Sequence, residues 1–193
     1  LLAYSEAVLN LETITKQSGV EVKDLESLKL SMETLFDKNA SHAIAVKTQH
    51  AYSRTLAWQE REDDDAAKVL EQYLSGDEPT KEQQLVLGDW CIGLAAKLCT
   101  QHDLPMKIHT GYLAGNDYMD LDRVRPSHLH NLFAKNLRTR FVLFHTGYPY
   151  QGEIVALAKH YQNVYADMCW AWTIDPHSSV GFVRQMLHTV PSH

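Results

Sequence analysis

Residues 140–167 read RFVLFHTGYPYQGEIVALAKHYQNVYAD, and this stretch decides the fold. Its apolar runs at 140–145 (RFVLFH) and 163–168 (NVYADM) have the length and composition of strands that are buried on both faces. Between them, residues 151–161 place apolar side chains at helical spacing. A strand, a helix and a second strand in this order predict two parallel strands joined by a helical crossover.

The same alternation extends towards the N-terminus. Two further buried strands are predicted at residues 42–48 (HAIAVKT) and 105–110 (PMKIHT). Asp24 is a good N-cap for a helix over residues 24–38, and Thr80 begins a long helix that runs to about His102. The remaining helices are expected after Asp63 and over residues 126–135, 151–161 and 178–188. The chain is therefore expected to be an α/β protein with a parallel sheet.

Two architectures satisfy this pattern, an open doubly wound sheet and a closed (β/α)8 barrel. The open sheet is typically accompanied by a glycine-rich phosphate turn, but neither GxGxxG nor GxxxxGK[ST] occurs here. The barrel is therefore favoured. A whole barrel needs about 250 residues, whereas this chain has 193, begins Leu-Leu-Ala without a Met and ends Pro-Ser-His. We read both ends as cut from something longer.

Composition excludes several classes of function. With 45% hydrophobic and 22% charged residues, the chain is typical of an ordinary globular protein. A net charge of -6 and the lack of a basic stripe argue against a nucleic-acid partner. No apolar stretch reaches the length of a membrane span. Cys91, Cys99 and Cys169 form no CxxC, so we expect reduced thiols in a cytoplasmic protein, with Cys91 and Cys99 on the buried side of their helix.

His109 and His145 each open a His-Thr-Gly triplet at the end of a predicted strand. In a parallel barrel, the carboxyl ends of the strands form the active site. An imidazole in this position can bind a metal or move a proton, and the glycine lets the chain turn sharply. A lone histidine here would more often be a structural hydrogen-bonding group, but the matched pair favours a functional site.

Other strand-end residues have two interpretations each. Lys47 is either an active-site cation or a lysine that reaches solvent from a strand end, and a carboxylated metal bridge is the less favoured form. Arg54 is either a clamp for a substrate carboxylate or a partner of an acidic loop. Asp167 either holds a histidine or a metal-bound water, or caps the following loop. Tyr148 and Trp170 are expected to line the substrate pocket.

His128-Leu129-His130 is an HxH pair that we do not interpret as a metal site. Such a pair suits a strand, where alternate side chains share a face. Here it lies in the helix predicted over residues 126–135, where positions two apart do not face one another. Six further histidines need no functional interpretation: His42, His102, His160, His177, His188 and His193.

Three segments resemble the amidohydrolase-related family of the amidohydrolase superfamily. They are AVKTQHAYSR at 45–54, KIHTGYLAGN at 107–116 and FVLFHTGYPYQGEIVALAKHYQNVYADMCWA at 141–171. The resemblance covers residues 25–193 and is nearest to the branch that includes a nodulin-like domain fused to glutamine-synthetase-like proteins. The combination of HTG with HTGYPY is fairly specific, whereas the helices alone are not.

This resemblance implies a TIM barrel with a metal site at its mouth. His109 falls at the family's fifth-strand metal histidine, His145 at the sixth-strand histidine and Lys47 at the fourth-strand lysine. Similar proteins hydrolyse C–N or C–O bonds or decarboxylate small acids, usually with zinc or manganese. The family's first-strand HxH and eighth-strand Asp do not appear here. Residues 1–193 are thus expected to form a partial barrel that covers about strands four to seven.

The leading hypothesis is a metal-dependent hydrolase or decarboxylase that acts on a small carboxylate-bearing substrate. His109 would be a metal ligand, His145 a ligand or general acid/base, and Arg54 and Lys47 would hold an anion. The alternative is a non-catalytic barrel that binds a ligand or another subunit. A third, less favoured hypothesis is a metal-independent isomerase or lyase on the same scaffold. The two open sheet edges of a partial barrel also predict self-association.

Overall fold

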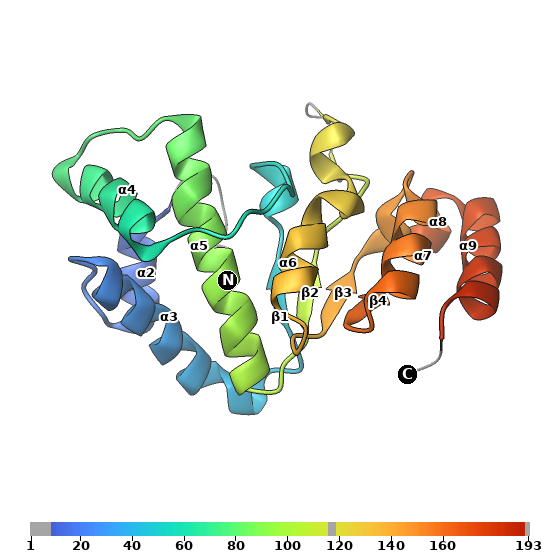
Figure 1. Ribbon diagram of the computed structural model, residues 1–193, viewed down its shortest axis with the longest axis horizontal. Coiled ribbons are helices and arrows are strands. Elements are labelled where there is room, and N and C mark those ends of the chain that lie inside the picture. Colours follow the sequence, from blue (N-terminus) through green and yellow to red (C-terminus); the bar gives the residue numbers. More distant parts are fainter. Residues whose placement is uncertain (1–8, 116–118, 192–193) are drawn as a thin grey trace.

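A computed structural model describes residues 9–115 and 119–191 of the chain (Figure 1). Four short strands form one parallel sheet in the order β1-β2-β3-β4. Each strand pairs with the next one in the sequence and the order never reverses, which is the order of a (β/α) barrel rather than of a doubly wound sheet. The predicted α/β partial barrel is confirmed. The strands are β1 (Val46–Thr48), β2 (Met106–Ile108), β3 (Phe141–Leu143) and β4 (Val164–Ala166).

All four strands lie inside the predicted ranges but are shorter. The largest difference is at the first strand, because Ala40–His42 forms a 3-10 turn (η1) and β1 begins only at Val46. Backbone pairing continues beyond the assigned ends, since the His109 amide donates to the Thr48 carbonyl at 3.1 Å and the Phe144 amide donates to the Ile108 carbonyl at 3.0 Å. The candidate site residues therefore lie at the ordered carboxyl edge of the sheet.

Capping residues begin two of the helices where the sequence predicted. Asp24 caps α3 in a capping box with Ser27, and Thr80 caps α5 in a capping box with Gln83. Each box satisfies amide groups that have no partner within the first helical turn. The helices are α2 (Leu11–Ser18), α3 (Leu25–Asn39), α4 (Asp63–Ser75), α5 (Lys81–Gln101), α6 (His130–Lys135), α7 (Gln151–His160), α8 (Ala171–Ile174) and α9 (Pro176–Thr189).

Two helical predictions need correction, and two short helices were not predicted. The helix expected over residues 126–135 begins instead as the 3-10 turn η4 (Pro126–Leu129), and only then continues as α6. The last helix, α9, begins at Pro176, because Asp175 caps it by accepting from the Ser178 amide. The short helices α2 and α8 were not predicted, since neither has enough turns to show a clear period.

The two faces of the sheet have different surroundings. One face packs into the core, where Met106, Ile108, Phe141 and Leu143 are fully buried together with apolar side chains of the helices. Cys91 and Cys99 are buried in this core, as predicted, and are free thiols. In Figure 1, α2 and α4 lie on the other side of α5 from the strands. Because side chains alternate along a strand, the residues between these core residues point to the opposite face, which is open. On this open face, one row of register partners crosses the sheet: Lys47, Lys107, Val142 and Tyr165.

The edges of the sheet and the length of the helices bear on how the chain meets its surroundings. Within the described residues, β1 and β4 each have a single neighbouring strand, so both edges of the sheet are open. None of the helices in the described ranges combines the length and the apolar character that a bilayer span requires.

Candidate functional site

The two His-Thr-Gly triplets meet at the carboxyl edge of the sheet. His109 follows β2, and His145 begins the 3-10 turn η5 (His145–Gly147) after β3. Their ring centroids are 4.5 Å apart, and Nδ1 of His109 lies 3.2 Å from Nε2 of His145. Both side chains are almost fully buried. The structure thus brings together the pair of histidines that the sequence singled out.

The glycines of the triplets allow this approach. Gly111 has φ +71°, and a Cβ atom there would lie 2.4 Å from the carbonyl carbon of Gly147 and from the carbonyl oxygen of Tyr148. Gly147 has φ +62°, and a Cβ atom there would lie 2.7 Å from Pro126. An L side chain is strained at such φ values and would not fit at these distances. Gly111 therefore allows the two loops to pack backbone against backbone, and Gly147 leaves room for the side chains of Pro126 and Ile154.

The turn after β3 is strained in a way that positions His145. His145 (φ +62°) and Thr146 (φ +51°) both adopt left-handed backbone conformations, which residues other than glycine rarely adopt. Strand alternation alone would put Phe144, and not His145, on the side of the sheet that carries Lys107. The left-handed turn lets the His145 ring meet His109, and the Thr146 amide secures it by donating to the Asp167 carbonyl at 3.1 Å. Strain of this kind is concentrated at functional sites.

The outward nitrogens of both rings bind backbone carbonyls. Nε2 of His109 lies 3.0 Å from the Tyr112 carbonyl oxygen, and Nδ1 of His145 lies 2.6 Å from the Cys169 carbonyl oxygen. A carbonyl only accepts hydrogen bonds, so each of these nitrogens carries its ring's proton. In two neutral rings, the facing nitrogens, Nδ1 of His109 and Nε2 of His145, then both present lone pairs.

The local electrostatics favour these neutral rings. Burial, the neighbouring His145 and the Lys47 charge lower the pKa of His109 to about 4, against a smaller opposing effect of its bond to Tyr112. Burial and the Lys47 charge also lower the pKa of His145, although its bond to Cys169 and the Asp167 charge oppose this. Near pH 7 the pair is therefore uncharged and can accept a cation between its facing nitrogens.

This donor set fits half of a metal site. Two nitrogens bound to one tetrahedral zinc are about 3.3 Å apart, close to the 3.2 Å that separates the facing nitrogens. Metal-binding histidines also commonly donate their other N–H to a carbonyl, as both rings do here. No set of three or more His, Cys, Asp or Glu side chains placed to hold a metal occurs within residues 9–115 and 119–191.

Aromatic rings surround the histidine pair. Trp170, predicted to line the pocket, stacks on His145 with centroids 4.7 Å apart and is 40% exposed. Tyr52 packs edge-on against His109 at 4.7 Å, and its hydroxyl accepts from the Ala114 amide at 3.1 Å. Tyr52 was not predicted as a site residue. Tyr148 packs against Tyr112, at 6.4 Å between ring centroids, and is half-buried.

Asp167 and Lys47 lie on the open face beside the pair. Oδ1 of Asp167 accepts from the Cys169 amide at 2.6 Å, which is the loop-capping role foreseen for it, and Oδ2 lies 3.8 Å from Nζ of Lys107. Nζ of Lys47 is 4.3 Å from the ring centroid of Phe144. Lys107 was not predicted, although it stands two residues before His109 and strand periodicity places it on the same face.

Arg54, for which the sequence left open a substrate clamp or an acidic partner, lies against an acidic side chain of the chain itself. Its side chain is buried, and its guanidinium forms an ion pair with the buried carboxylate of Asp89 on α5. It also donates to the carbonyls of Thr55 and Ala57, both at 3.3 Å. This arrangement favours the pairing of Arg54 with an acidic side chain over the substrate clamp, although its Nη1 has no hydrogen-bond partner among the described residues.

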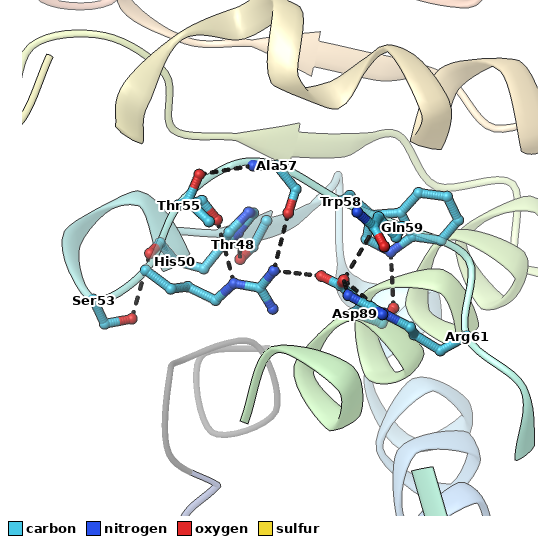
Figure 2. Close-up of polar contacts among 10 residues, drawn as sticks. Thr48, His50, Ser53, Thr55, Ala57, Trp58, Gln59, Arg61 and Asp89 are labelled. Atoms are coloured by element: carbon cyan, nitrogen blue, oxygen red, sulfur yellow. Dashed lines mark hydrogen bonds and ion pairs between the residues drawn. The ribbon is translucent and has the colours of Figure 1, made fainter. Parts of the chain in front are cut away.

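Asp89 organises the segment that follows η2 (His50–Tyr52). Figure 2 shows Trp58, Gln59 and Arg61 gathered around it. Arg61 Nη2 and the Gln59 amide donate to Oδ2 of Asp89 at 3.0 and 3.2 Å, and Nε1 of Trp58 donates to the Asp89 carbonyl at 2.8 Å. An acidic residue within an otherwise apolar helical stretch was the available sequence signal for this network.

His50 is a further buried histidine, to which the sequence analysis assigned no role. Its Nδ1 lies 2.9 Å from the Thr48 hydroxyl. Burial, with smaller effects of the Arg54 and His109 charges, lowers the pKa of His50 to about 3. His128 and His130, excluded as a metal pair, have separate partners, Asp122 and the Ser127 carbonyl.

Comparison with known proteins places this architecture in a family. Residues 90–193 match the family model described as amidohydrolase. The chain belongs to the amidohydrolase family. It is also 28% identical to protein fluG of Emericella nidulans over 193 residues, an alignment that covers 91% of this chain and 22% of fluG.

Solved structures share the amidohydrolase fold of this chain. A protein from Lactobacillus casei ATCC 334, described as a metal-dependent hydrolase, superposes with a TM-score of 0.69 at 18% identity, over 95% of this chain and 53% of that one. Uronate isomerase from Thermotoga maritima gives 0.69 at 16% identity, over 93% and 43%. Glucuronate isomerase from Caulobacter crescentus gives 0.66 at 20%, over 93% and 40%. The chain spans about half or less of these structures and about a fifth of fluG.

Proposed function

We propose that this amidohydrolase domain provides two ligands of a divalent metal site in an enzyme that hydrolyses a C–N or C–O bond, or decarboxylates, a small carboxylate-bearing substrate. The observation that carries the proposal is the pair of facing nitrogens of His109 and His145, 3.2 Å apart, whose outward nitrogens are bound to carbonyls. Family membership supports the same reaction class.

The residues of the chain would divide the work as follows. His109 and His145 would hold the ion, zinc or manganese, in the orientation that Tyr112 and Cys169 already impose. When bound, such an ion supplies Lewis-acid polarisation and makes a coordinated water more acidic. Trp170 would form a wall beside His145 and exclude water from one side of the site. Lys47 would add positive charge next to the pair.

His145 has a second candidate role as a general acid/base. Burial and the Lys47 charge lower its pKa, whereas its bond to the Cys169 carbonyl and the Asp167 charge raise it. A group of this kind can be tuned for proton transfer. The His145→Asn variant separates the two roles: loss of metal identifies a ligand, whereas retained metal with an altered pH–rate profile identifies an acid/base.

The deciding measurement is the transition-metal content of the full-length protein. We expect about one zinc or manganese ion per chain, in keeping with one histidine-based site, and a loss of most of it in His109→Ala and His145→Ala. His160→Ala is the matched control, because His160 is exposed on α7 away from the pair. Full metal content in both site variants would contradict the proposal. With metal shown, small amides, lactones and carboxylates are the substrates to screen.

A further inference from the structure

Two lysines stand side by side on the open face of the sheet, beside the histidine pair. Lys47 on β1 and Lys107 on β2 are register partners, so their side chains leave the sheet on the same face. Both ammonium groups reach the same ring: Nζ of Lys47 is 4.3 Å and Nζ of Lys107 is 5.1 Å from the centroid of Phe144. The two side chains therefore converge, although like charges repel one another.

Carboxylates on this face do not balance the two cations. Lys107 pairs with Asp167, but the separation of 3.8 Å is long, and Asp167 also accepts a much shorter bond from the Cys169 amide. Lys47 is exposed and forms no ion pair within the described ranges. A net positive charge thus remains over Phe144, where it can attract an anion.

This positive charge is next to the candidate metal ligands. His109 follows Lys107 by two residues, just beyond the end of β2, and the Lys47 charge acts on both histidines. Arg54 does not compete for an anion here, because Asp89 already holds its guanidinium. The lysine side chains are also accessible, since Lys107 retains 30% of its side-chain exposure in spite of its partners.

We infer that Lys47 and Lys107 together form an anion subsite that binds the carboxylate of a small carboxylic acid next to His109 and His145. The assignment of this acid as the substrate rests on the proposed function, but the binding itself does not. Two ammonium groups can each donate to one carboxylate, and a charge-assisted hydrogen bond is stronger than a neutral one. Asp167 would then compete with the ligand for Lys107.

Malonate, with malonamide as its uncharged analogue, is a suitable probe for isothermal titration calorimetry. The full-length protein is titrated as purified and after treatment with a chelator, because malonate can also bind a metal. We expect malonate but not malonamide to bind in both states. Lys47→Met and Lys107→Met should each weaken malonate binding about tenfold, as loss of a charge-assisted bond does. Lys107→Arg should retain binding, and Asp167→Asn should tighten it about threefold by releasing Lys107.

Matched controls separate this inference from general charge effects and from the proposed function. Lys159→Met removes an exposed lysine of α7 and should leave malonate affinity unchanged, and thermal melting monitors folding of every variant. His109→Ala should still bind malonate after chelation, whereas both lysine variants should retain their metal. Malonate affinity unchanged in the Lys47→Met/Lys107→Met double variant would overturn the subsite, as would equal binding of malonamide or no binding of malonate by the unmodified protein. Lysine-dependent binding in a protein without metal would retain the subsite and reject the proposed function.

Discussion

Gly111 and Gly147 lie in direct backbone contact, so close that a Cβ atom on Gly111 would be 2.4 Å from the Gly147 carbonyl carbon. Each is the third residue of a His-Thr-Gly triplet, and the histidines that open the two triplets also meet, with their facing nitrogens 3.2 Å apart. The repeated triplet is therefore more than two similar strand ends. It is a pair of turns in contact, and neither turn has room for a Cβ atom at its glycine.

Substitution of Gly111 should damage both the fold and the site. Gly111→Ala introduces a Cβ atom that overlaps backbone atoms at 2.4 Å and is strained at φ +71°. We expect a loss of about 2–4 kcal/mol in the free energy of unfolding and a fall in metal content. Urea unfolding and elemental analysis measure these effects. Gly152→Ala, in α7 with open space around its Cβ position, should leave the stability unchanged or raise it by up to about 1 kcal/mol. Equal behaviour of the two variants would contradict the packing argument.

Loss of the Asp89 carboxylate charge should lower the free energy of unfolding, because Arg54 is buried beside it. In Asp89→Asn, the guanidinium of Arg54 remains buried without its counter-ion. Breaking a buried ion pair in this way typically destabilises a protein by about 3–5 kcal/mol. Asp65→Asn removes a carboxylate from an exposed pair with Lys68 and should cost less than about 0.5 kcal/mol. Chemical denaturation of both variants tests the comparison, and a small effect of Asp89→Asn would show that Arg54 is not dependent on this partner.

The buried His50 should make the domain sensitive to acid. Its pKa is about 3 in the folded chain and about 6.5 in the unfolded chain, so over this window the unfolded state binds more protons. Stability is fully present above about pH 6.5 and falls as the pH decreases. Between pH 7 and pH 5 this single group should account for about 2 kcal/mol of lost stability.

The His50→Gln variant tests this account of acid sensitivity. It should lose about 2 kcal/mol less between these two pH values than the unmodified protein, as measured by urea unfolding at each pH. His42→Gln, at an exposed histidine of η1, serves as the control and should show the unmodified pH dependence. If the stability of His50→Gln falls with pH as steeply as that of the unmodified protein, His50 is not the source of the acid sensitivity.

The open edges of the sheet should make the 193-residue chain self-associate when it is expressed by itself. The outer backbone groups of β1 and β4 have no neighbouring strand within the described residues, and such edges pair readily with other strands. Light scattering should show a mass that rises with concentration. Ile44, 89% exposed just before β1, adds an apolar contact at one edge, so Ile44→Lys should reduce the association. A monomer at all concentrations would contradict this prediction.

Periodicity was sufficient to predict the alternation of strands and helices. Short apolar runs with polar borders located all four strands, and the cap residues Asp24 and Thr80 located the starts of two helices, because these signals act within a few residues of one another. The predictions of the strand ends and of the segment that forms η4 were less accurate. Backbone pairing across the sheet decides where a strand ends, and local sequence does not show it.

The sequence by itself determined which residues would lie at the carboxyl edge of the sheet, because strand position follows from local pattern. It singled out His109 and His145 through their repeated triplet. Only the tertiary structure decided how the side chains at that edge are used. In the folded chain, nitrogens of His109 and His145 face one another. Arg54 forms an ion pair with Asp89 on α5, and Lys107 lies beside Lys47 on the neighbouring strand. These partners are far apart along the chain, so no local pattern specifies them, and burial and charge pairing select among the candidates only once the chain is folded.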